Sequence, residues 1–132
     1  MTDDERAAAA RTELALRDQL RNPLLLGTVA PALKVQIEIA RRRGTHVELQ
    51  TEPLHDLVIL TLVARVLRDS LPTLGATATI RAVATGPDAA SVSVTAGPLA
   101  SVAAPDGVVT RAMTDDDFSM LSITRAGASD PT

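Results

Sequence analysis

The chain has 132 residues, a formal net charge of −3 and no cysteine, and Phe118 is its single Phe, Trp or Tyr residue. This length gives one domain, or a small domain with a helical extension, and the missing cysteine excludes disulfides and thiolate metal sites. Two histidines on different expected elements do not make a zinc site, so we expect no metal. The acidic balance and the lack of stacking aromatic residues argue against nucleic acid as a partner. No signal peptide or transmembrane run is visible, so we expect a cytoplasmic protein without a membrane partner.

The first 44 residues predict two helices joined by a short turn. Thr2 and the acidic residues after it form a capping box for a helix over residues 3–21. A second helix is expected over residues 28–43, with Gly44 as its left-handed C-cap. Two consecutive helices of this kind indicate a helical hairpin over residues 1–44, which a second copy could complete as a four-helix bundle. We therefore expect a homodimer in which this hairpin supplies the dimer interface and a docking surface.

Residues 54–71 are the most apolar stretch of the chain, with ten Leu, Val or Ile side chains among eighteen residues. The stretch is too apolar for a surface helix, and its short length and its charges exclude a membrane span. We expect the central helix of the fold here, with Thr51 as its N-cap. Val63, Val66 and Leu67 should share one buried face, because they follow i, i+3, i+4 spacing.

Four strands are expected after the hairpin, over residues 45–50, 76–85, 90–96 and 118–125. In the first of them Val47 and Leu49 should face inward, and a turn after residue 85 makes a β-hairpin of the next two. Residues 97–107 are expected to form a loop, and the alternative of a short helix over residues 106–113 stays open. The fold class is therefore α+β, with an N-terminal helical hairpin followed by a small α/β sandwich that has a mainly antiparallel sheet. The sandwich is expected over residues 45–126, followed by a disordered tail over residues 127–132.

Two runs of like charge have simple structural explanations. Residues 41–43 are all arginine and lie in the expected last turn of a helix, where they stabilise the helix dipole; an anion site is the alternative. Residues 115–117 are all aspartate and are expected in a solvated turn, because three consecutive carboxylates cannot all point at one cation. His46 alternates with Val47 and is expected on the solvated face of its strand.

Several stretches of the sequence resemble the family of histidine kinases and bacterial histidine phosphotransferases. Residues 40–49, Ala-Arg-Arg-Arg-Gly-Thr-His-Val-Glu-Leu, are similar to the junction at which the last bundle helix of a kinase enters its ATP-binding sandwich. Residues 62–80 are similar to the N-box helix, the Gly-Ala turn and the strand that follows. Residues 69–75, Asp-Ser-Leu-Pro-Thr-Leu-Gly, resemble the degenerate domain of the phosphotransferases, which does not use ATP. The resemblance implies a helical hairpin followed by a shortened, truncated GHKL-like sandwich.

The sequence departs from the family pattern at the positions that would hold a nucleotide. A working N box has a Glu that positions water and an Asn that holds magnesium, and the matching residues here are Arg65 and Asp69. An arginine cannot accept a proton, so Arg65 cannot act as a general base. The Asp-x-Gly motif that recognises adenine is replaced by Thr95-Ala96-Gly97, and a Gly-rich phosphate lid is missing. The resemblance therefore implies a pseudokinase that binds no cofactor.

Two positions are candidates for a phosphorylated residue. Residues 18–24 are similar to the kinase H box, with an exposed Asp18 in place of the histidine, so a match here would mark a lost activity; an ordinary helix end before proline is the alternative. His55-Asp56-Leu57 has the His-acidic-Leu order of phosphotransferase acceptors, and a neighbouring carboxylate can orient the ring and raise its basicity. This pair lies in the first turn of the sandwich helix rather than in the bundle, so His55 with Asp56 is the second hypothesis.

The leading hypothesis is a non-catalytic two-component signalling protein that binds a response regulator or a sensor kinase. The resemblance implies that Asp18, Arg21 and Asn22, at the end of the first helix, bind this partner. One alternative is an active histidine phosphotransferase that uses His55. Another is a small-molecule or nucleotide-binding module that uses the cavity between the central helix and the β-hairpin.

Overall fold

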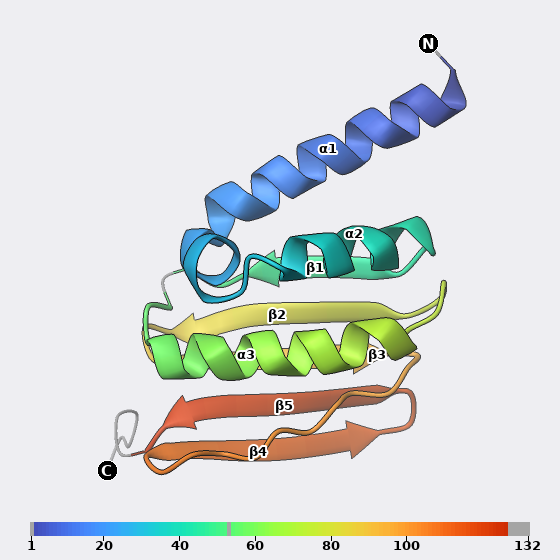
Figure 1. The fold of residues 1–132 in the computed structure, drawn as a ribbon. Helices are drawn as coiled ribbons and strands as arrows, with labels where there is room; N and C mark the ends of the chain where they lie inside the picture. The colour runs from blue at the N-terminus through green and yellow to red at the C-terminus, as the bar shows by residue number, and fades with distance from the viewer. Residues whose placement is uncertain (1, 53, 127–132) are drawn as a thin grey trace.

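A five-stranded sheet forms one layer of the protein, and two helices cover one of its faces (Figure 1). The structure is a computed structural model that describes residues 2–52 and 54–126. The strand order is β1-β2-β3-β5-β4, in which β1 pairs with β2 in parallel and the other neighbours are antiparallel. The strands are β1 (His46–Gln50), β2 (Thr79–Gly86), β3 (Ala89–Thr95), β4 (Val108–Asp115) and β5 (Phe118–Arg125). This arrangement confirms the predicted α+β class and the mainly antiparallel sheet. The predicted tail over residues 127–132 lies outside the described residues.

The central helix α3 (Leu57–Ser70) packs across the sheet and continues into the short 3-10 helix η2 (Leu71–Thr73). The predicted buried face is confirmed, because Val63, Val66 and Leu67 are all fully buried. The predicted N-cap is wrong. Asp56 caps α3, because its side chain accepts hydrogen bonds from the first amides of the helix, whereas the side chain of Thr51 is buried and bonded elsewhere.

The N-terminal helices follow the prediction only in part. Helix α1 (Asp3–Arg21) has the expected bounds, and the side chain of Thr2 accepts a hydrogen bond from the Glu5 amide. The single helix expected over residues 28–43 is wrong, because a π-helical turn η1 (Leu25–Val29) precedes a shorter α2 (Leu33–Arg42). Pro31 explains the break, since it has no N–H to donate inside a helix. Gly44 has a φ of +99°, which confirms the left-handed C-cap.

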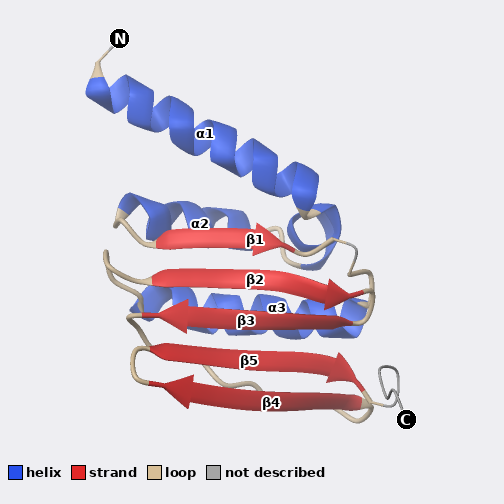
Figure 2. Cartoon of the chain, turned by 180° about the vertical axis from the view of Figure 1, so that it is seen from behind, coloured by secondary structure: helices blue, strands red, loops and turns tan. Residues whose placement is uncertain are grey.

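Helix α2 belongs to the layer that covers the sheet, and α1 stands outside it. Leu33, Ile37 and Ala40 of α2 join the same hydrophobic core as α3 and the strands. By contrast, Asp18 is the only buried residue of α1. The two helices run in roughly opposite directions and diverge, so that the N-terminal half of α1 projects beyond β1 at the edge of the sheet (Figures 1 and 2). The two helices therefore form the expected hairpin, but they pack against each other only near the end of α1 that adjoins the body.

The second half of the sheet differs from the prediction at β4. A helix over residues 106–113 is wrong, because these residues enter β4, which pairs with β5 along eight positions. A helix that short would bury little surface and would leave β5 with an unpaired edge. The turn between the two strands contains Asp116 with a φ of +46°, and residues 115–117 are exposed as predicted. The loop before β4 packs Leu99 and Val102 against the core.

Candidate functional site

A buried polar cluster joins α1, α2 and β1, and Asn22 is at its centre. Asn22 directly follows α1 and is fully buried. Its side-chain Nδ2 donates to the carbonyl oxygens of Asp18, at 2.8 Å, and Leu49, at 3.3 Å. Its Oδ1 accepts from both the amide and the hydroxyl of Thr51, each at 2.7 Å. All the polar groups of the Asn22 side chain are therefore used within the protein.

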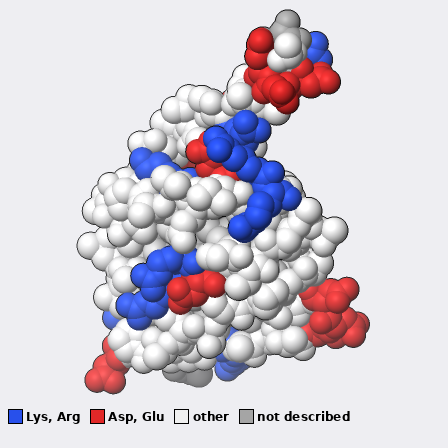
Figure 3. Space-filling view, turned by 45° about the vertical axis from the view of Figure 1, so that its right-hand side comes forward, with Lys and Arg blue, Asp and Glu red and all other residues white. Residues whose placement is uncertain are grey.

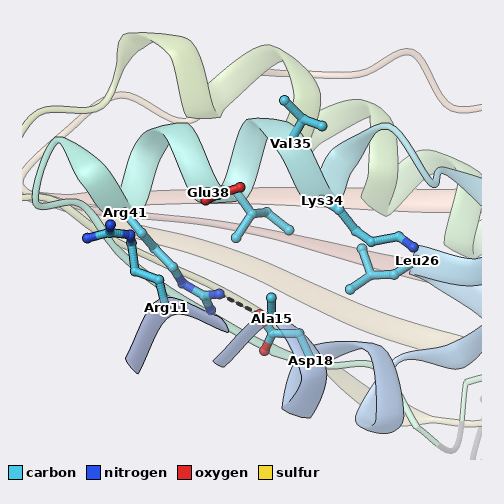
Figure 4. A pocket seen from close by; sticks show the side chains of 9 residues that line it. Arg11, Ala15, Asp18, Leu26, Lys34, Val35, Glu38 and Arg41 are labelled. Carbon is cyan, nitrogen blue, oxygen red and sulfur yellow. Dashed lines mark ion pairs between the residues drawn. The ribbon is translucent and has the colours of Figure 1, made fainter. Parts of the chain in front are cut away.

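Asp18 is paired with Arg41 across the gap between α1 and α2 (Figure 4). Arg41 Nη1 lies 2.6 Å from Asp18 Oδ2, and both side chains are only 11% exposed. The other nitrogen of the same guanidinium, Nη2, donates to the carbonyl of Val47 at 2.8 Å. The expectation of an exposed Asp18 is wrong, because this ion pair buries it. A matched pair in this setting costs much to break, since one charge would remain buried alone.

The cluster also provides hydrogen-bond donors for the backbone carbonyls on the outer edge of β1. The amide of His46 donates to Ala78 beside β2, so the alternate residues Val47 and Leu49 direct their backbone groups away from the sheet. Their two carbonyl oxygens are the ones that Arg41 and Asn22 cover. An edge strand capped in this way is a poor template for a further strand. The cluster therefore fixes the base of α1 to the sheet.

Each residue of the arginine triplet has a defined partner, which the helix-dipole explanation did not predict. Arg41 belongs to the buried cluster, and Arg42 pairs with Glu38 one turn earlier on α2. Arg43 donates to the carbonyl of Leu71 at 2.7 Å, which ties the end of α2 to the end of α3. The partners of Arg41 and Arg43 are distant in the sequence, so no local pattern could have identified them.

Two grooves flank α1 where it meets the body of the protein. The groove between α1 and α2 has a volume of about 120 Å³ and is lined in part by Ala15, Leu26 and Val35 (Figure 4). The groove between α1 and β1 is larger, about 580 Å³. Its acidic lining residues are Asp18 and Glu48. Five arginines also line it: Arg11, Arg17, Arg21, Arg41 and Arg81. The larger groove is therefore basic, although the chain as a whole is acidic.

Of the three residues expected to bind a partner, the structure leaves only Arg21 exposed. Asp18 and Asn22 are buried in the cluster at the base of α1 and bonded to the same chain. They position α1 instead of presenting groups to a partner. Figure 3 shows acidic side chains at the tip of the projecting helix and basic side chains nearer to the body.

His55 and Asp56 lie beside each other in sequence but have separate environments. His55 is exposed and lines a pocket of about 200 Å³ together with Pro23 and Thr51. The Asp56 carboxylate is engaged by Arg125, whose Nε and Nη2 donate to it at 2.9 Å and 3.0 Å. It also caps α3, and none of the described contacts joins it to the His55 ring. The expected orientation of His55 by Asp56 is therefore not seen.

The pKa of Asp56 reflects these contacts. Partial burial raises the pKa, but hydrogen bonds from Arg125 and from the Ile59 amide outweigh it, so the pKa of Asp56 is lowered from its ordinary value of 3.8. A carboxylate held in the charged form by an arginine is a structural ion pair. Sequence reasoning missed Arg125, which lies 69 residues from Asp56 and carries no local signal.

The degenerate N-box positions lie on the outer side of α3. Arg65 and Asp69 are both exposed, and Asp69 pairs with its neighbour Arg68 at 3.3 Å. Arg65 lines a groove of about 420 Å³ between α3 and the loop before β4, together with Leu57 and other largely apolar residues. Thr95, at the position expected to recognise adenine, is exposed at the end of β3. A ligand in this groove would meet one positively charged side chain, that of Arg65, and a largely apolar lining.

A small charged group lies on the face of the sheet that the helices leave open. His46 Nε2 is 2.9 Å from Glu48 Oε1, and Arg81 Nε is 2.8 Å from Glu48 Oε2. The hydrogen bond with His46, together with the charge of the nearby Arg81, lowers the pKa of Glu48 and outweighs burial, which raises it. The three side chains are about half exposed or more, so water screens these pairs. The solvated position predicted for His46 is confirmed.

Within residues 2–52 and 54–126, no group of three or more His, Cys, Asp or Glu residues is placed to hold a metal ion. In the same part of the chain, no helix has both the length and the apolar character needed to cross a membrane. No protein-family model and no curated protein sequence matches the chain.

Proposed function

We propose that this protein is a non-catalytic, dimeric two-component signalling protein that binds a response regulator or a sensor kinase through α1 and α2. One observation carries this proposal: α1 is held firmly at its base by buried polar contacts, yet it is almost uncovered along its length. Most of the stability of a helix in a protein comes from packing one of its faces against a partner, and α1 has only one buried residue in its 19. A helix anchored in this way is suited to meeting another protein.

The apolar side chains left exposed on both helices support a protein partner. On α1, Leu16 is 59% exposed and Leu20 is 79% exposed. On α2, Val35 and Ile39 are 61% and 49% exposed. Large apolar side chains left exposed on two neighbouring helices are typical of interaction surfaces. The class of partner follows from the resemblance in sequence to histidine kinases and phosphotransferases.

The non-catalytic part of the proposal is supported by the chemistry at the degenerate positions. Arg65 has no lone pair to accept a proton where the family has its general base. Asp56, which could have activated His55, instead accepts hydrogen bonds from Arg125 and from the first amides of α3. Active phosphotransfer through His55 stays the alternative, and the exposure of that ring favours it. The small-molecule alternative expected a cavity between the central helix and the β-hairpin, whereas the groove beside Arg65 lies between α3 and the loop before β4.

The test is binding of the purified chain to a panel of receiver domains and sensor kinases from its own organism, measured by calorimetry. We expect at least one partner to bind, and Leu16→Ser combined with Leu20→Ser to weaken binding about tenfold or more. Val109→Ser is the matched control, because Val109 is 52% exposed on β4 and far from α1 in the sheet order. If no receiver or kinase binds at tens of micromolar, the proposal is wrong.

A phosphotransfer assay separates the proposal from its main alternative. The chain is mixed with a phosphorylated kinase or receiver, and phosphate incorporation is followed. We expect no incorporation, in both the unmodified chain and the His55→Gln variant. Incorporation that disappears in His55→Gln would replace the non-catalytic proposal by active phosphotransfer.

A further inference from the structure

One face of α1 carries a stripe whose spacing is that of a coiled-coil seam. Its members alternate in steps of four and three residues, which places them along one side of a helix: Asp3, Ala7, Ala10, Leu14, Arg17 and Arg21. All six are exposed, and the stripe is distinct from the side of α1 that carries Leu16. It is acidic at its N-terminal end, small in the middle and basic at its C-terminal end.

The basic half of this stripe faces the larger groove. Leu14, Arg17 and Arg21 line the space of about 580 Å³ between α1 and β1, where Arg81 contributes a further cation. The N-terminal half of the same helix projects beyond the body (Figure 1). It carries four consecutive alanines at residues 7–10, whose side chains are small. Small side chains let two helices approach closely.

The charges on the stripe distinguish the two ways in which two copies of α1 can pair. In an antiparallel pair, Asp3 lies opposite Arg21 of the second copy, Ala7 opposite Arg17, and Ala10 opposite Leu14, and each layer occurs twice by symmetry. In a parallel pair in register, every residue meets itself. Two aspartates and two layers of arginines would then face one another, which is unfavourable.

We infer that two copies of this chain pair through antiparallel α1 helices, so that the alanine-rich N-terminal half of each α1 occupies the basic α1–β1 groove of the other. This inference rests on the dimer in the proposed function and specifies its geometry. Asp3 then lies beside the arginines of the partner's groove, while Ala10 and Leu14 supply the apolar centre. Leu16 and Leu20 stay uncovered on the other side of α1, where the signalling partner binds.

Engineered cysteines test the orientation cleanly, because the chain has none of its own. Chains carrying Asp3→Cys and chains carrying Arg21→Cys are mixed, equilibrated and oxidised mildly, and the disulfide-linked species are separated by mass. An antiparallel pair gives the mixed 3–21 disulfide in clear excess over both homodimers. A parallel pair gives the two homodimers and little mixed product, which would overturn the inference. Leu16→Cys, on the other side of α1, is the control and should give little cross-linked dimer.

Charge reversal supplies a second readout that does not depend on oxidation. In sedimentation equilibrium, Arg21→Glu should weaken the dimer about tenfold, because two attractive pairs become repulsive. Adding Asp3→Arg to that variant should restore the affinity, since each pair is then attractive again with its signs exchanged. A double variant as weak as Arg21→Glu, or a reversal without any effect, would contradict the antiparallel pairing.

The two proposals fail in different ways. A chain that is monomeric at 100 μM concentration, about the upper end of useful dimer affinities, overturns the antiparallel pair even if the monomer binds a response regulator. A chain that forms the 3–21 disulfide but binds neither receivers nor kinases supports the antiparallel pair and overturns the signalling function.

Discussion

Replacing Asn22 by alanine tests whether the buried cluster holds α1 to the sheet. Asn22 is fully buried, and the substitution removes an acceptor from Thr51 and a donor from Leu49, which are themselves 2% and 5% exposed. The Thr51 hydroxyl can rotate toward another acceptor, but the Thr51 amide and the Leu49 carbonyl cannot. At about 1 to 3 kcal/mol for each of these two buried unpaired groups, the expected loss is roughly 2 to 6 kcal/mol.

Such a loss is a large share of the total stability of a small domain, which is about 5 to 15 kcal/mol. The chain has no Trp or Tyr, so unfolding in urea is best followed by far-ultraviolet circular dichroism. Gln19→Ala is the control, because Gln19 is exposed one turn earlier on α1 and its loss should change the free energy of unfolding by about 0.5 kcal/mol or less. Asn22→Asp keeps the oxygen for Thr51 but loses the donor to Leu49, so it should also destabilise.

The reasoning is refuted if Asn22→Ala loses less than about 1 kcal/mol, because water or a local shift would then satisfy the groups that Asn22 leaves. A double-mutant cycle with Thr51→Ala gives an independent check. The two side chains share one hydrogen bond at 2.7 Å, so their effects should not be additive.

Three further predictions follow from the core, the ion pair at the start of α3 and the degenerate nucleotide positions. Leu67→Ala should cost roughly 2 to 5 kcal/mol in urea unfolding, whereas the exposed Asp69→Ala should change stability by about 0.5 kcal/mol or less; equal losses would show that Asp69 has a buried partner. The lowered pKa of Asp56 contributes stability that is complete above its ordinary value of 3.8 and is lost as the pH falls through the folded-state pKa, because the unfolded chain then binds the proton first. Arg125→Gln should reduce the stability that is lost on acidification. The check is the free energy of unfolding in urea, measured above and below pH 3.8 for both chains. If the Asp56–Arg125 pair contributes nothing, the two chains will show the same dependence on pH. Calorimetry with ATP and magnesium should detect no binding tighter than about 100 μM, roughly −5.5 kcal/mol, since Arg65, Asp69 and Thr95 replace the groups that hold magnesium, phosphates and adenine; tighter binding would contradict the pseudoenzyme proposal.

The sequence by itself determined the elements whose signals are local. The capping box at Thr2 and the glycine at residue 44 mark where a helix begins and where one ends, and the structure confirms both positions. The spacing of Val63, Val66 and Leu67 was enough to identify a buried face, because a helix brings residues three and four apart to the same side. The last strand, β5, also has its predicted bounds.

The tertiary structure decided the features that depend on residues far apart in the chain. Residues 108–115 became a strand because β5 offered an edge to pair with, although their local pattern also allowed a helix. Asp56 replaced Thr51 as the cap of α3 because Thr51 was needed by Asn22, 29 residues away. Asp18 was expected on the surface and is buried because α2 returns to place Arg41 against it. Local sequence carries the propensity of each segment, whereas burial and partnership are properties of the assembled layers, and this is why only the structure located the buried cluster and the basic groove beside α1.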